Sequence, residues 1–164
     1  VIEEGCEGPL CYAGGRLDIG EAMSPPLIRS VKKHLHAATV RIVDAPPGTS
    51  CPAVAAVDGA SYVVLVAEPT PFGLNDFKLA VGMTRALGIP FGALINRADM
   101  GNDELEQYCA DEGVEVLAKI PYSREIAERY SRAEVAEFLA ERYSREIGMV
   151  LERAKQHQSE RRAR

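Results

Sequence analysis

The chain has 164 residues, of which 46% are hydrophobic and 26% are charged, and its formal net charge is −5. These values are typical of one globular domain with a single core, and the acidic balance argues against a nucleic-acid-binding surface. No apolar run approaches the roughly 20 residues that span a bilayer, and the first residues, VIEEGC, lack the basic start of a signal peptide. We therefore expect a cytoplasmic protein without stable membrane insertion and without a nucleic-acid partner.

The first predicted helix covers residues 21–37. Apolar residues that include Leu35 recur there at helical spacing, Ser24 suits the N-cap, and Pro25 and Pro26 suit the first turn.

Buried parallel strands are predicted at residues 40–45, 61–68 and 91–96, with a weaker one at 114–121. The first three sequences, VRIVDA, SYVVLVAE and FGALIN, are rich in Val and Ile and do not alternate with polar residues, and the fourth is VEVLAKIP. This composition is typical of strands that are covered on both faces.

Further helices are predicted at residues 73–88 and 102–113, and a long C-terminal helix at 133–158. Strands that alternate with helices indicate right-handed crossovers. The fold class predicted is therefore α/β, a doubly wound, mostly parallel sheet flanked by helices. We treat residues 1–164 as a single domain.

The four cysteines are irregularly spaced, at positions 6, 11, 51 and 109. In a chain of intracellular character, this spacing favours reduced thiols or metal ligands over a disulfide framework. Cys109 lies within the amphipathic pattern of a predicted helix, so we expect it in the core. We expect His34, His36 and His157 at the surface, because they have no partner at metal-ligand spacing.

The segment VRIVDAPPGT places Asp44 at the end of a predicted buried strand. In a doubly wound sheet, ligands bind beyond the carboxyl ends of the strands, where a carboxylate can hold the water shell of Mg²⁺ against nucleotide phosphates. The turn that follows is stiff except at Gly48, whose backbone N–H could contact a γ-phosphate. The alternative is that Asp44 only ends a strand and caps the next helix.

The segment INRAD ends another predicted strand. Asn96 offers an amide donor and acceptor that suit the edge of adenine. Asp99 could accept a hydrogen bond from an exocyclic amine or hold the loop. The alternative is an ordinary polar exit from a strand.

Taken together and in this order, these segments resemble the MinD/ParA/Mrp branch of the P-loop ATPases, the CobQ/CobB/MinD/ParA nucleotide-binding superfamily. The resemblance rests on VDAPPGT, the stretch VVLVAEPTPFGLNDFKLAVGMTRALGIPFGALINRAD, and VLAKIPYS, and it covers roughly residues 15–125. The segment LDIGEAMSPPL at 17–27 is most similar to MinD-like ATPases with an inserted ferredoxin domain.

The resemblance implies a P-loop NTPase-like fold, ATP with Mg²⁺ as cofactor, and homodimers that sandwich the nucleotide. It also implies a role for each matching position: Asp44 as the Walker B carboxylate, Gly48 in switch II, Asn96 and Arg97 at the adenine, and Pro121 and Tyr122 at the base or ribose.

The sequence departs from the family at the phosphate-binding loop. The segment AGGRLDIG at 13–20 has glycines but no Lys followed by Ser or Thr. Without that loop, neither a nest of backbone N–H groups nor a lysine neutralises the phosphates. We therefore expect the Walker A portion to be missing and the chain to be the carboxy-terminal part of a longer ATPase. Alone, it should be inactive.

In the related nitrogenase iron protein, a cluster-binding cysteine follows the switch II aspartate at the spacing of Cys51 from Asp44. Cys11, in EGPLCYAGG, resembles the other ligand segment, so Cys11 and Cys51 are candidate ligands of a [4Fe–4S] cluster shared by two protomers. Alternatively, Cys51 is present for packing, and Cys6 with Cys11 forms the tail of a ferredoxin insert.

The resulting hypothesis is an ATP-binding domain whose parent protein couples ATP hydrolysis to an iron–sulfur or electron-transfer event with a ferredoxin-type or iron–sulfur protein partner. Two alternatives remain open. One is an iron–sulfur-binding dimer that resembles the nitrogenase iron protein, and the other is a non-catalytic partner-binding module.

Overall fold

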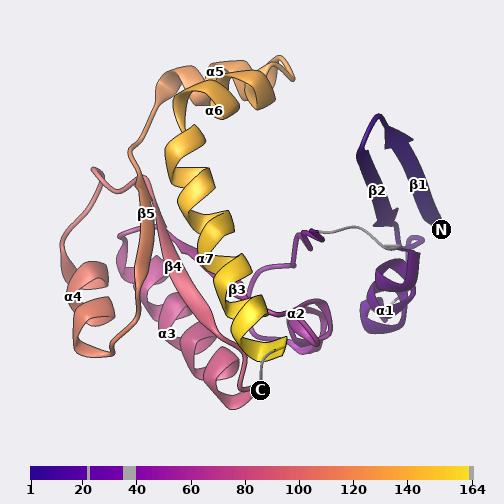
Figure 1. Cartoon of the computed structure of the whole chain (residues 1–164), viewed down its shortest axis with the longest axis horizontal. Helices are drawn as coiled ribbons and strands as arrows, with labels where there is room; N and C mark the ends of the chain where they lie inside the picture. Colours follow the sequence, from indigo (N-terminus) through magenta and orange to yellow (C-terminus); the bar gives the residue numbers. More distant parts are fainter. Residues whose placement is uncertain (22, 35–39, 163–164) are drawn as a thin grey trace. The chain divides into compact units, whose positions relative to one another are not determined.

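The computed structural model describes residues 1–21, 23–34 and 40–162, with side chains described as far as residue 158 (Figure 1). The chain forms two compact units, Val1–Gly59 and Ala60–Arg164.

The first unit begins with a hairpin. Strands β1 (Ile2–Glu7) and β2 (Leu10–Gly15) pair antiparallel. Helix α1 (Ser24–His34) packs against β2 and carries two prolines in its first turn, as predicted. The prediction for Leu35 and the end of that helix lies outside the described residues, as does His36.

Helix α2 (Cys51–Val57) is held to α1 by a lysine. The Lys32 ammonium donates to the carbonyl oxygens of Ala55, Ala56 and Asp58 at 3.2, 3.0 and 2.5 Å. These carbonyls lie at the C-terminal end of α2, where the helix dipole is negative and backbone acceptors have no partner within the helix. Lys32 thus caps α2 and joins the two helices.

The strand predicted at residues 40–45 does not form, so that prediction was wrong. Residues 41–46 are in neither a strand nor a helix, and Ile42 is 78% exposed. The composition of VRIVDA favours burial, but a strand also needs a neighbour for its hydrogen-bond ladder. In the described part of the chain, the two sheets are β1–β2 and β3–β4–β5, and neither pairs with this segment.

The second unit contains a three-stranded parallel sheet in the order β3 (Val63–Ala67), β4 (Phe91–Asn96) and β5 (Val116–Ile120). These strands confirm the predictions at 61–68, 91–96 and 114–121. The mixed α/β class, with a parallel sheet flanked by helices, is also confirmed.

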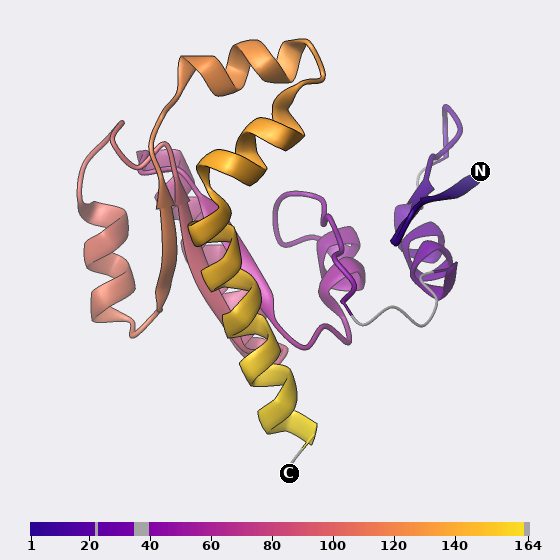
Figure 2. The same ribbon diagram turned by 45° about the horizontal axis from the view of Figure 1, so that its top comes forward.

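Helices cover both faces of this sheet. Helix α3 (Pro71–Ala86) packs on β3, and α7 (Ser144–Arg162) packs on β5. Figures 1 and 2 show α7 in front of the sheet and α3 behind it. Helix α4 (Glu104–Asp111) follows β4 and buries Leu105 and Cys109, which confirms the prediction that Cys109 belongs to the core.

The C-terminal segment contains more helices than predicted. Helix α5 (Arg124–Ser131) precedes α6 (Val135–Arg142), and α6 meets α7 at Tyr143. The stretch predicted as one helix, 133–158, therefore changes direction at Tyr143, which is 8% exposed and has a φ of −121°. Burial of this aromatic ring accompanies the break, and hydrophobic periodicity alone does not reveal it. No helix in the described ranges is long and apolar enough to cross a membrane.

Candidate functional site

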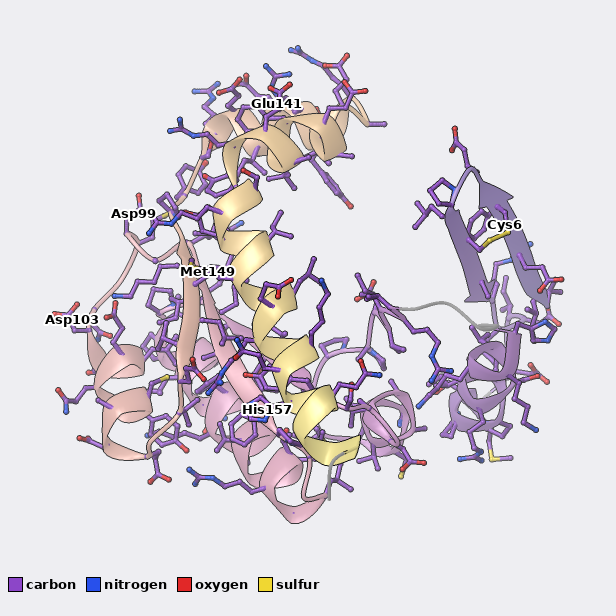
Figure 3. The ribbon with its side chains drawn as sticks, in the orientation of Figure 1. Cys6, Asp99, Asp103, Glu141, Met149 and His157 are labelled. Atoms are coloured by element: carbon purple, nitrogen blue, oxygen red, sulfur yellow. A yellow bond between two sulfur atoms is a disulfide. The ribbon has the colours of Figure 1, made fainter. Side chains whose placement is uncertain are left out.

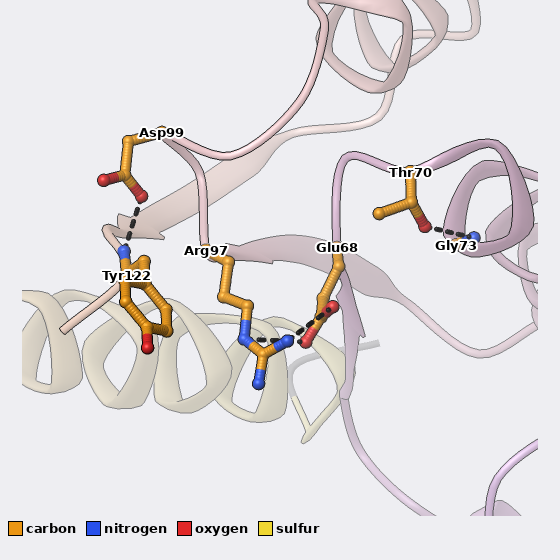
Figure 4. Close-up of polar contacts among 6 residues, drawn as sticks. All are labelled: Glu68, Thr70, Gly73, Arg97, Asp99 and Tyr122. Carbon is orange, nitrogen blue, oxygen red and sulfur yellow. Dashed lines mark hydrogen bonds and ion pairs between the residues drawn. The ribbon is translucent and has the colours of Figure 1, made fainter. Parts of the chain in front are cut away.

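The carboxyl ends of β3, β4 and β5 form one edge of the sheet in the second unit. Ala67 is in register with Ile95, and Asn96 with Ile120, so the three strands end together. The loops after them therefore lie side by side, and Figure 4 shows side chains from all three. We call this edge, with the residues that follow each strand, the carboxyl rim.

Arg97 and Glu68 join the loops after β4 and β3. Arg97 Nε lies 3.4 Å from Glu68 Oε1, and the Arg97 guanidinium also lies over the Tyr122 ring, 5.9 Å from its centre (Figure 4). Both charged side chains are partly exposed, so the pair contributes little to stability. Arg97 has a φ of 51°, a conformation that is uncommon outside glycine and often found at functional sites.

Asp99 joins the loops after β4 and β5. Its Oδ1 accepts a hydrogen bond from the Tyr122 backbone N–H at 2.5 Å, and Ala98 N donates to Ile120 O at 3.0 Å. Of the two roles that the sequence left open for Asp99, this contact matches the loop-holding one.

The loop after β3 packs closely on the loop after β4. Gly101 has a φ of 154°, and a Cβ atom there would lie 1.9 Å from the Pro69 carbonyl oxygen. Only glycine allows this approach between two backbones. Thr70 caps α3 by accepting a hydrogen bond from Gly73 N at 3.0 Å. The three loops thus support one another.

Sequence reasoning identified Asn96, Arg97, Pro121 and Tyr122 on this edge, and the structure brings their segments together. Asn96 is partly buried, whereas Arg97, Pro121 and Tyr122 are exposed. Sequence reasoning missed Glu68, although it lies at the end of a predicted strand just as Asp44 does. A consistent search for acids at strand ends would have found it.

Asp44 and Gly48 belong to the first unit. Asp44 is exposed and lies within residues 41–46, which form neither a strand nor a helix. The strand that was expected to position Asp44 therefore does not form. Gly48 has a φ of 84°, which agrees with the flexible joint expected in the Pro-Pro-Gly-Thr turn.

The pairing of the cysteines differs from one expectation, that of reduced thiols, and bears on a second, that Cys11 binds an iron–sulfur cluster. Cys6 and Cys11 form a disulfide, so the expectation of reduced thiols was wrong for this pair. The register of the hairpin places them opposite each other, which irregular spacing in the sequence cannot reveal. While the disulfide is closed, Cys11 offers no thiolate to iron. In the described part of the chain, no group of three or more His, Cys, Asp or Glu residues could hold a metal ion.

Cys51 and Cys109 are free but differ in environment. Cys51 is exposed and lines a hollow of about 350 Å³ with Arg29, Thr49 and Asp58. Cys109 is buried, and burial, together with the nearby Glu106 carboxylate, raises the pKa of its thiol.

A second hollow of about 370 Å³ lies at the opposite, amino end of β4 and β5. Arg85, Glu115 and Arg153 are among the residues that line it, and His157, which also lines it, stacks on Tyr62 with ring centres 5.1 Å apart. The Tyr62 hydroxyl is buried without a hydrogen-bond partner in the described structure, and burial raises its pKa. Two Arg–Glu ion pairs, Arg85–Glu112 and Arg153–Glu115, neutralise the charge around this hollow.

Two uncharacterized proteins of Methanocaldococcus jannaschii are similar to this chain. MJ0579 is 31% identical over 122 residues, which are 73% of this chain and 42% of MJ0579. MJ0578 is 30% identical over 104 residues, which are 62% of this chain and 37% of MJ0578. The chain therefore spans less than half the length of these curated relatives. No protein-family model and no solved structure matches it.

Proposed function

We propose that this chain is the adenine-nucleotide-binding part of a MinD/ParA/Mrp-type ATPase with a P-loop NTPase-like, doubly wound fold. The observation that carries the proposal is the carboxyl rim. Asp99 of INRAD and Tyr122 of IPYS, 23 positions apart in the sequence, meet at the edge of a parallel sheet, where ligands of doubly wound folds bind.

The proposed contacts follow from the chemistry of the rim. The Asn96 amide hydrogen-bonds the adenine edge, and Arg97, Pro121 and Tyr122 line the base and ribose. A base that stacks on Tyr122 or under the Arg97 guanidinium gains π and cation–π contacts. Glu68 keeps Arg97 in place until the ligand arrives.

The phosphate end of the ligand requires groups that the sequence does not contain. The sequence has no Gly-Lys-Thr or Gly-Lys-Ser loop that would hold the β- and γ-phosphates. The resemblance assigns Asp44, in the first unit, to the water shell of Mg²⁺, which neutralises phosphate charge when bound, and the Gly48 N–H to the γ-phosphate. An exposed carboxylate suits this role, because Mg²⁺ usually keeps several waters and takes few protein ligands. We expect this chain alone to bind ADP weakly and to hydrolyse no ATP.

The partner and assembly are proposed on the same basis. The whole protein would form a homodimer that sandwiches nucleotide and would couple hydrolysis to a ferredoxin-type or iron–sulfur partner. The iron–sulfur alternative is favoured by the exposed thiol of Cys51. It requires that the Cys6–Cys11 disulfide open before Cys11 can join a [4Fe–4S] cluster, so the donor set as it stands does not fit a cluster.

The binding experiment compares two matched arginines. Arg97 and Arg85 are both partly exposed and both paired with a glutamate, but Arg97 lies on the carboxyl rim and Arg85 on the amino-end hollow. A fluorescent ADP analogue with Mg²⁺ should bind Arg97→Ala about three to ten times more weakly than the unaltered chain. Arg85→Ala should bind it unchanged. Equal effects of the two substitutions, or no binding at millimolar nucleotide, would reject the proposal and favour a non-catalytic partner-binding module.

A further inference from the structure

The hairpin β1–β2 has almost no core of its own. Its residues are exposed or only partly buried, and the two strands form a separate two-stranded sheet. Isolated two-stranded hairpins are marginally stable in water. Something else must therefore keep the strands together.

Helix α1 holds one end of the hairpin. A Cβ atom on Gly15 would lie 2.8 Å from a Val31 methyl group and 2.9 Å from Leu27 Cγ, so β2 lies directly on the helix. His34 Nδ1 lies 3.0 Å from Glu4 Oε2. We call the hairpin end that carries these contacts, residues 1–4 and 13–16, the base.

The disulfide holds the other end. Cys6 and Cys11 are directly paired, one residue before and one residue after the pair Glu7–Leu10 that closes the turn. Side chains alternate along a strand, so the disulfide lies on the same face as Glu4 and Gly15 but nearer the turn. Both cysteines are exposed, and Figure 3 shows their S–S bond beside the Cys6 label. We call residues 5–12 the tip.

We propose that Cys6–Cys11 is a thiol–disulfide exchange site whose chemical partner is a dithiol reductant, and that its state sets the order of the hairpin tip. Exposed disulfides are accessible to thiolate attack, whereas structural disulfides that resist reduction are usually shielded. The base keeps its contacts with α1 in both states. Only the tip depends on the sulfur–sulfur bond.

The exchange is balanced in electrons and protons. A thiolate of the dithiol attacks one sulfur of the pair, the Cys6–Cys11 bond breaks, and a mixed disulfide forms. The second thiol of the reductant then attacks that mixed disulfide and releases the protein. Two electrons and two protons pass to Cys6 and Cys11, which become thiols, and the reductant leaves as a disulfide. A disulfide oxidant reverses the steps.

The size of the effect follows from the loop that the bond closes. A cross-link that closes a loop of six residues lowers the chain entropy of the open hairpin tip. This loss shifts the equilibrium between the open and the closed tip toward the closed one by roughly 40-fold. Reduction should therefore accelerate amide exchange at the tip about 40-fold. The base should change much less, because α1 still covers it.

The test is amide hydrogen exchange of the full chain, followed by NMR before and after treatment with dithiothreitol. Thiol titration of the unfolded, oxidised chain should find two thiols, Cys51 and Cys109, and four after reduction. The tip should exchange faster on reduction, both in the unaltered chain and in Cys51→Ser. Cys6→Ser and Cys11→Ser should show fast tip exchange with and without the reductant.

Three results would each overturn the proposal. The first is a count of four thiols in the chain purified in air. The second is a disulfide that dithiothreitol does not reduce while the protein stays folded. The third is an amide exchange rate of the tip that does not change on reduction. The two serine variants separate loss of the bond from a side effect of the reagent.

Discussion

The carboxylate of Asp99 accepts a hydrogen bond from the backbone N–H of Tyr122 at 2.5 Å, and this contact fastens the loop after β5 to the loop after β4. The proposed nucleotide site therefore depends on a residue that does not itself need to touch the ligand. The contact is charge-assisted, although Asp99 is exposed to solvent.

Substituting Asp99 should loosen the rim. We expect Asp99→Ala to lower the free energy of unfolding of the second unit by about 1 kcal/mol and to accelerate exchange of the Tyr122 amide. Asp99→Asn keeps an acceptor oxygen and should recover part of the loss. Urea unfolding and amide exchange measure the two effects. A Tyr122 amide equally protected in all three chains would show that the contact does not hold the loop.

Gly101 provides a sharper test of how the loops pack. The Cβ of Gly101→Ala would lie 1.9 Å from the Pro69 carbonyl oxygen at a φ of 154°, so we expect a loss of about 2 kcal/mol or more. Gly82→Ala is the control, because Gly82 lies within α3 and a Cβ there meets open space. That change should be stabilising by roughly 0.5–1 kcal/mol. Thermal unfolding of both variants measures the contrast, and a tolerated Gly101→Ala would contradict the loop arrangement described.

Lys32 should matter for the first unit. Removing its ammonium leaves the C-terminal carbonyls of α2 without their donor, so Lys32→Met should destabilise α2 by about 1 kcal/mol. The neighbouring Lys33 is exposed, and Lys33→Met serves as the control. Limited proteolysis should cut near Asp58 faster in Lys32→Met only. Equal cleavage in both variants would indicate that the capping contact contributes nothing.

The Cys109 thiol should make stability depend on alkaline pH. Burial raises its pKa above the ordinary value of 9.0, so the folded chain holds the proton more tightly than the unfolded chain. The stability that the protonated Cys109 thiol contributes is fully present below pH 9.0 and is lost as the pH rises through the pKa of the folded chain. Urea unfolding between pH 8 and pH 10 should show a decline that is shallower in Cys109→Ala. The same decline in both chains would assign the effect to other groups, since the pKa values of Tyr62 and Tyr108 are raised from 10.0.

The sequence predicted the second unit well for a physical reason. Its three strands are local runs of Val, Ile and Leu, and the polar residues that follow them necessarily gather at one edge of a parallel sheet. Residues 40–45 have the same composition but no strand partner, and composition reports burial rather than pairing. The Cys6–Cys11 bond and the break at Tyr143 likewise depend on register and on packing between distant residues, which a single sequence does not display.

Glu68 illustrates the same limit at the candidate site. Its role depends on Arg97, 29 positions away, and this pairing appears only when both strands end at one edge. The position of the rim could be predicted from the sequence, but the Arg97–Glu68 ion pair on it could not.

The most direct test of the proposed function is where the nucleotide binds. Titration of the ¹⁵N-labelled chain with Mg²⁺–ADP should shift the amides of residues 96–101, 122 and 123, with little change at residues 113–115 beside the amino-end hollow. Shifts centred on that hollow, or no shifts at any concentration up to several millimolar, would contradict the nucleotide-binding account.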